Sequence, residues 1–198
     1  MTITSLLGLL GTLIGLVRAL PQLFSLLRAK QARGVSVDTA ATSSIVSFGW
    51  TAYGLFTNQP YVVLATGSSA MVFFLVAFFA LRYGRHIREV KIAPVWFCIL
   101  LLAALTKKEL GLGVILPVSV LISNVPQLWV AWKEDNLADL SLGTWLLSMS
   151  DGTVWGAYSL IQHDTSIMTF AFFQLTTSGM IVLLKLLKRE YIRKKTSY

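Results

Sequence analysis

Three side chains that could handle a polar or charged solute follow one helix face late in the chain. Asp151, Trp155 and Tyr158 stand at positions i, i+4 and i+7, a spacing that places them on the same face. They lie within an apolar stretch, and an acid at membrane depth normally faces a cavity or a partner. Asp151 could accept a proton, bind a cationic amine, or pair with a neighbouring donor as a structural carboxyl. We favour a functional role.

Arg18 is the second unusual charge. It lies one turn before Pro21, on the same predicted helix face. Its guanidinium could hold a solute carboxylate through two parallel hydrogen bonds. It could also pair with Asp151 or extend toward the membrane interface. The structural pair with Asp151 is slightly favoured over a ligand role.

A duplication positions these residues. The chain repeats at an offset of 105 residues, which pairs Pro21 with Pro126, Gln22 with Gln127, Ser36 with Ser141, Trp50 with Trp155, and Tyr53 with Tyr158. Both copies are strongly apolar, and repeats in membrane proteins usually flank a solute path. Asp151 belongs to the second copy alone, because the first copy has Val46 at that position.

The composition indicates a membrane protein. Hydrophobic residues make up 55% of the 198 residues and charged residues 13%, well under the roughly 25% charged residues of soluble domains. A spanning helix needs roughly 20 mostly apolar residues. The expected spans are 3–27, 39–57, 61–81, 92–106, 110–132, 142–161 and 166–187. The predicted fold is an all-α membrane protein with seven transmembrane helices arranged 3+1+3, two parallel triple-helix bundles joined by a linker helix.

The predicted organisation has four parts. They are a first bundle at 1–83, a basic loop with the linker helix at 84–108, a second bundle at 109–187, and a basic tail at 188–198. Fourteen Lys and Arg residues fall on one side of these spans and two on the other. This asymmetry predicts an outside N-terminus and a cytoplasmic C-terminus, and we expect the plasma membrane. The tail is expected to meet anionic lipid headgroups rather than nucleic acid.

Two prolines mark the first helix of each bundle. Pro21 and Pro126 each remove one backbone hydrogen bond and therefore kink the helix. The amides of Gln22 and Gln127 could donate to the freed backbone groups. The kinks could be hinges that open one side of the path, or static features of packing, and both interpretations stay open.

The order of these motifs resembles a known repeat. The matching segments are the Pro-Gln pairs, the basic loops with Val35-Ser36 and Leu140-Ser141, and the Trp50-x-x-Tyr53 and Trp155-x-x-Tyr158 pairs. Together they resemble the PQ-loop repeat of the PQ-loop, SemiSWEET and SWEET transporters, over nearly the whole chain outside the linker helix. The resemblance implies alternating access and a small polar cargo such as a sugar or an amino acid. Half-size relatives dimerise, so a homo-oligomer stays open.

The resemblance also assigns residues. It places Trp50, and Trp155 by repeat symmetry, on the wall of the substrate pocket. Sugar-carrying relatives have an asparagine sixteen residues after that tryptophan, where this chain has Thr66 and Ala171. The nearest amide is Gln174, three residues further along. The missing asparagines weaken the assignment to sugars without excluding it.

The predicted function is transport of a small polar solute about the proline hinges. An amino-acid-like substrate is placed slightly ahead because of Asp151, with proton coupling left open. A SWEET-type sugar facilitator is the alternative, and a non-transporting membrane receptor on the same fold is the alternative of another class. The sequence has no metal-ligand, phosphate-binding or cofactor motif, so no enzyme, metal or cofactor is expected. The predicted substrate-binding residues are Arg18, Trp50, Tyr53, Thr66, Asp151, Trp155, Tyr158 and Gln174.

Overall fold

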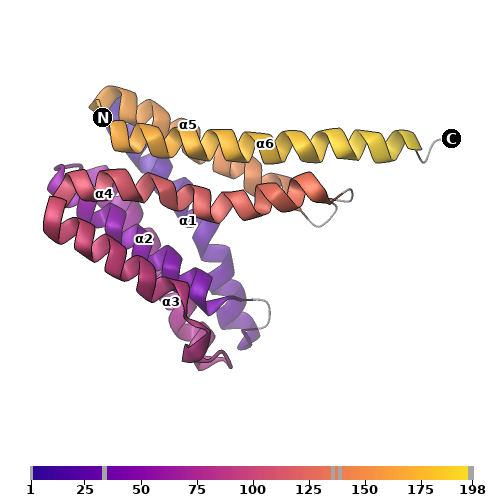
Figure 1. The fold of residues 1–198 in the computed structure, drawn as a ribbon, viewed down its shortest axis with the longest axis horizontal. Helices are drawn as coiled ribbons and strands as arrows, with labels where there is room; N and C mark the ends of the chain where they lie inside the picture. The colour runs from indigo at the N-terminus through magenta and orange to yellow at the C-terminus, as the bar shows by residue number, and fades with distance from the viewer. Residues whose placement is uncertain (1, 33–34, 135–136, 138–139, 196–198) are drawn as a thin grey trace. The chain divides into compact units, whose positions relative to one another are not determined.

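The chain folds into helices throughout its described parts. The computed structural model describes residues 2–32, 35–134, 137 and 140–195, with side chains up to residue 188. In chain order the elements are α1 (Ile3–Ala29), α2 (Val37–Phe56), α3 (Pro60–Arg82), the short 3-10 helix η1 (Ile87–Glu89), α4 (Ile92–Lys133), α5 (Leu142–Gln162) and α6 (Thr165–Lys195) (Figure 1). The predicted all-α class is confirmed. The side chains of the basic tail beyond residue 188 lie outside the described part.

Three of these helices are long and apolar enough to cross a membrane. They are α1, α3 and the Thr165–Lys188 part of α6. Large apolar side chains such as Phe74, Phe78 and Leu183 are exposed on α3 and α6. An apolar helix face that is exposed over this length needs lipid as its solvent. The helices therefore support an integral membrane protein.

A sharp bend divides α4 into two helical segments. The backbone of Lys108 leaves the helical region, with φ 46° and ψ −126°. Close to this bend the two segments approach so tightly that a Cβ on Gly111 would lie 2.6 Å from the carbonyl oxygen of Ala103. Only glycine fits such an approach without a backbone shift. The bend lies between the predicted spans 92–106 and 110–132.

The duplicated sequence gives duplicated helix starts. α2 and α5 begin 105 residues apart, and each follows a serine cap. The Ser36 hydroxyl accepts a hydrogen bond from the Thr39 N–H at 3.2 Å, and the Ser141 hydroxyl accepts one from the Thr144 N–H at 3.3 Å. These caps satisfy N–H groups that have no partner inside the helix. The equivalent caps explain why both helices begin at the same repeat position.

The turns that follow are also equivalent. Asn58 after α2 and His163 after α5 both adopt the left-handed conformation, each with φ 53°. In each turn the next residue donates its N–H to a carbonyl five residues earlier, at 2.8 Å in the first copy and 3.1 Å in the second. α3 and α6 then begin 105 residues apart. The two copies thus share their backbone conformation through the cap, the helix and the turn.

Two compact units make up the chain, Met1–Leu116 and Pro117–Tyr198. In the first unit α3 packs against both α1 and α2. Its buried core contains small and branched side chains, among them Ala19, Val76 and Ala80, which let the helices approach closely. In the second unit α5 packs against α6.

Asp38 connects α2 to the start of α4. Its carboxylate accepts hydrogen bonds of 2.9 to 3.0 Å from the N–H groups of Lys91, Ile92 and Ala93. An acid at this place satisfies the free N–H groups of α4 and interacts favourably with the helix dipole. The second copy has Gly143 at the equivalent position.

Candidate functional site

The repeated tryptophan and tyrosine form the same contact in both units. The Trp50 and Tyr53 rings meet edge to face with centroids 5.5 Å apart, and the Trp155 and Tyr158 rings do so at 5.2 Å. All four side chains are buried. Edge-to-face contact is a favoured geometry for aromatic pairs, because the positive ring edge meets the negative ring face. Each unit therefore presents one matched aromatic pair.

Close helix packing in the second unit places Gln174 of α6 beside Gly152 of α5. A Cβ on Gly152 of α5 would lie 2.9 Å from Leu175 Cγ and 3.3 Å from Gln174 Cγ of α6. Glycine therefore lets α5 approach α6 at the level of Gln174. Asp151, next to this contact, is buried with 6% of its surface exposed. The predicted residues Asp151, Trp155 and Gln174 thus belong to one region of the second unit.

A buried amide network extends from Gln174. The Asn124 amide nitrogen of α4 donates to the Thr177 hydroxyl at 2.8 Å and to Gln174 Oε1 at 3.3 Å. The Gln174 amide nitrogen in turn donates to the Ser148 carbonyl of α5 at 3.5 Å. These four residues, which we call the amide network, are all buried. They link the second segment of α4, α5 and α6 through neutral hydrogen-bonding groups.

The sequence offered Gln174 as a binding residue and Asn124 as a polar residue that could line the path, but it did not pair them, and Thr177 was not singled out. The two partners are 53 residues apart in the chain, so only the folded unit brings them together. Comparison of the copies carries the signal that could have found them. The first copy has Ala19 where the second has Asn124, and Val72 where the second has Thr177. The amide network is therefore a property of the second copy alone.

Thr66 makes a smaller polar contact in the first unit, with one hydroxyl of the neighbouring helix. Its hydroxyl lies 3.0 Å from the Thr51 hydroxyl of α2 and donates to the Val62 carbonyl at 2.7 Å. This pair joins α2 to α3. Thr66 is half-buried, and its role in binding stays a prediction.

The remaining predicted residues lie on more open helix faces. Arg18, Pro21 and Gln22 are exposed on α1. In α4, Pro126 is exposed and Gln127 is half-buried. Both prolines lie inside helices, as expected. Their action as hinges, and the pairing of Arg18 with an acid, stay predictions.

The fold has a solved counterpart. The structure of a eukaryotic SWEET transporter, determined at 3.7 Å resolution, is similar with a TM-score of 0.73 over 96% of this chain and 100% of that chain. The sequence identity is 14%, so the likeness establishes the fold. No family model matches the chain, and no curated protein matches its sequence.

Proposed function

From this shared fold we propose that the protein is a membrane transporter that carries a small polar solute by alternating access. The observation that carries the proposal is the likeness to a SWEET transporter over 96% of the chain. The duplicated caps, turns and aromatic pairs support it, because paired repeats are a common architecture of secondary transporters. We extend the proposal to a 3+1+3 arrangement of seven spans, with the bend at Lys108 separating the linker helix from the second bundle.

We propose a neutral, hydroxylated solute such as a sugar as the first candidate. In the second unit, the Trp155–Tyr158 pair offers an apolar face and the amide network offers neutral donors and acceptors. Asn124 Oδ1 makes no hydrogen bond within the described residues, which suits an acceptor for a solute hydroxyl. Asn124 thereby supplies a side-chain amide, which this chain lacks at Thr66 and Ala171, the positions where sugar-carrying relatives have asparagine. This reverses the narrow preference for an amino acid that the sequence alone gave.

An amino acid is the second candidate, and Asp151 favours it. The side chain is buried in α5, on the helix that also bears Trp155 and Tyr158. A buried acid in a spanning segment is a functional candidate by default. In this version Asp151 binds the solute ammonium or couples transport to a proton.

We propose that Pro21 and Pro126 act as hinges of the cycle. Each lies inside a helix and lacks the N–H that would complete the backbone hydrogen bonds of that helix.

From the distribution of Lys and Arg, we propose that the N-terminus lies outside and the C-terminus lies in the cytoplasm of a plasma-membrane protein. A non-transporting receptor on the same fold is the alternative of another class, which a flux measurement must address.

Uptake into proteoliposomes tests the proposal. Purified full-length protein is reconstituted and assayed with labelled sugars and labelled amino acids, with and without an inward proton gradient. We expect saturable sugar uptake that is independent of the gradient and survives Asp151→Asn. Gradient-stimulated amino-acid uptake that disappears in Asp151→Asn would establish the second candidate instead. Solute binding without flux would refute transport and identify a receptor.

A matched pair of tryptophan variants tests the site. Trp155→Leu should lower uptake, because it removes both the aromatic face proposed to contact the solute and the edge-to-face contact with Tyr158. Trp129→Leu is the control, because Trp129 is exposed and its ring contacts the Lys133 ammonium, 4.6 Å from the ring centroid, rather than Tyr158. Equal uptake by the two variants would contradict a binding role for the aromatic pair.

A further inference from the structure

The loop between α3 and α4 lies next to two apolar helix faces. Phe78, one turn before the end of α3, is 50% exposed, and Ile92 at the start of α4 is 54% exposed. Exposed apolar side chains of a spanning helix face hydrocarbon, so a loop bounded by them lies close to the lipid headgroups. Arg82, the last residue of α3, is exposed and begins the polar stretch. Both ends of the loop therefore carry exposed apolar side chains next to polar residues, as a segment at a bilayer surface would.

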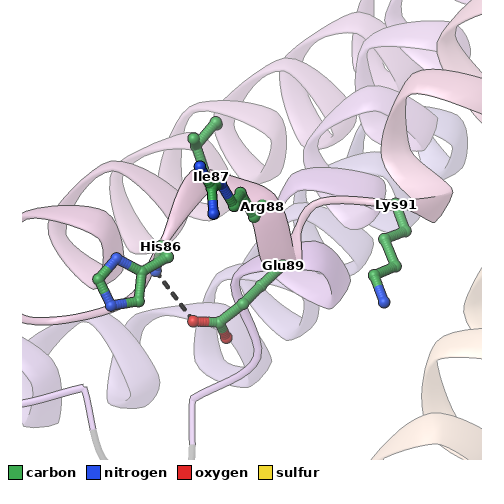
Figure 2. Close-up of a pocket in the computed structure, with 5 residues that line it drawn as sticks. All are labelled: His86, Ile87, Arg88, Glu89 and Lys91. Atoms are coloured by element: carbon green, nitrogen blue, oxygen red, sulfur yellow. Dashed lines mark hydrogen bonds between the residues drawn. The ribbon is translucent and has the colours of Figure 1, made fainter.

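This loop contains a surface hollow. A cavity of about 590 Å³ is lined by His86, Ile87, Arg88, Glu89 and Lys91 (Figure 2). The short helix η1 shapes it, and Glu89 Oε1 accepts a hydrogen bond from the His86 N–H at 2.9 Å. Ile87 is 68% exposed beside these charged groups. An exposed isoleucine next to cations is the composition of a surface that touches both acyl chains and headgroups.

The acids near this hollow are already engaged. Glu89 forms an ion pair with Arg85 at 3.3 Å in addition to its contact with the His86 N–H. The Asp38 carboxylate accepts the three N–H groups at the start of α4. Within the described residues no acid pairs with Arg88 or Lys91, and both are exposed. The hollow therefore offers two unneutralised cations.

We propose that this hollow binds the headgroup phosphate of an anionic phospholipid. Arg88 provides the two-pronged donor geometry that suits phosphate oxygens, and Lys91, the residue before α4, adds a second charge. Ile87 enters the acyl region beside the headgroup. Anionic lipid at a membrane surface attracts each nearby Lys or Arg by roughly 1 kcal/mol. The site is independent of the proposed transport, and it fixes the α3–α4 loop to one leaflet.

Lipid titration of the purified full-length protein, followed by native mass spectrometry, tests the site. The dissociation constant of the first bound lipid is measured for phosphatidylglycerol and for phosphatidylcholine. Removing both charges in Arg88→Gln/Lys91→Gln should weaken phosphatidylglycerol binding about 25-fold, because each charge contributes about fivefold. Phosphatidylcholine binding should stay within about twofold of the unaltered protein. Ile87→Ser should weaken phosphatidylglycerol binding by a further few-fold through lost apolar contact.

A second double variant with the same charge change is the control. Lys107→Gln/Lys108→Gly removes two exposed cations at the bend of α4, and glycine accommodates the φ of 46° and ψ of −126° at position 108. We expect this variant to retain phosphatidylglycerol binding. Equal weakening by both double variants would overturn the proposal in favour of net charge alone. Displacement of the lipid by millimolar inorganic phosphate would overturn it in favour of a soluble-anion site.

The fold of each variant is checked by its thermal unfolding in detergent micelles. If the Arg88→Gln/Lys91→Gln protein does not fold, phosphatidylglycerol binding is measured instead for Ile87→Ser and for the single variant Arg88→Gln. Unchanged phosphatidylglycerol binding by both of these would also overturn the site.

Discussion

The bond between Asn124 and Thr177 leads to a quantitative prediction about the second unit. Asn124→Leu keeps the side-chain volume close to the original but removes the donor to Thr177 at 2.8 Å and to Gln174 at 3.3 Å. Hydrogen bonds between membrane helices contribute about 0.6 kcal/mol on average and up to about 1.7 kcal/mol. Loss of two such bonds should lower the free energy of unfolding by about 1 to 3 kcal/mol.

A double-mutant cycle isolates the bond to Thr177. Thr177→Val removes the same acceptor, together with the local bond from its hydroxyl to the Phe173 carbonyl at 2.7 Å. The double variant should therefore lose less stability than the two single losses combined, by about 0.6 to 1.7 kcal/mol. Reversible unfolding of the full-length protein in mixed micelles measures all four states.

Ser123→Ala is the matched control for this cycle. Ser123 precedes Asn124 but is exposed, and its hydroxyl donates to the Ser119 carbonyl at 3.2 Å within its own helix. Its replacement should change the unfolding free energy by at most about 0.5 kcal/mol. Additive single losses, within about 0.5 kcal/mol, would refute the coupling between α4 and α6. A control that destabilises as strongly as Asn124→Leu would refute the reasoning as well.

Two further predictions concern the helix ends and the bend. Asp38→Ala should lower the unfolding free energy by about 1 to 2 kcal/mol by removing the cap of α4, while Asp38→Asn should lose less because it keeps an acceptor oxygen. Chemical unfolding in micelles measures both losses. Equal losses for Asp38→Ala and Asp38→Asn would show that the negative charge, rather than an acceptor oxygen, stabilises the start of α4. Gly111→Val should reduce the yield of folded protein, because its Cβ would meet the Ala103 carbonyl at 2.6 Å. Gly143→Ala, where a Cβ meets nothing within 4 Å, should not do so; size-exclusion profiles of both variants decide.

The helix starts could be predicted from the sequence because their causes are local. Ser36 and Ser141 cap their helices through the residue three positions later, which the sequence contains directly. The end of α6 could not be predicted in the same way. The apolar span was expected to end at 187, but the helix continues to Lys195. Lys, Arg and Glu are good helix formers in water, so a helix can continue after its apolar segment ends.

In the candidate site, too, local features could be predicted from the sequence and contacts between helices could not. Trp155 and Tyr158 could be assigned to one face because helix periodicity alone relates them. Asn124 could not be assigned a partner, because its hydrogen bonds reach residues 50 and 53 positions away. Such contacts depend on helix packing, here on the close approach at Gly152, and short-range patterns do not encode which helices meet.

The matched backbones of the two copies have an evolutionary consequence. In an assembly of two identical subunits every substitution appears in both copies, so an acid like Asp151 would introduce a second buried carboxylate at the equivalent position. In one fused chain the acid appears once, opposite Val46 in repeat position. The shared caps and turns keep the helix frame unchanged while individual side chains diverge. One chain with two copies can therefore carry a charge in one copy alone, which an assembly of two identical subunits cannot.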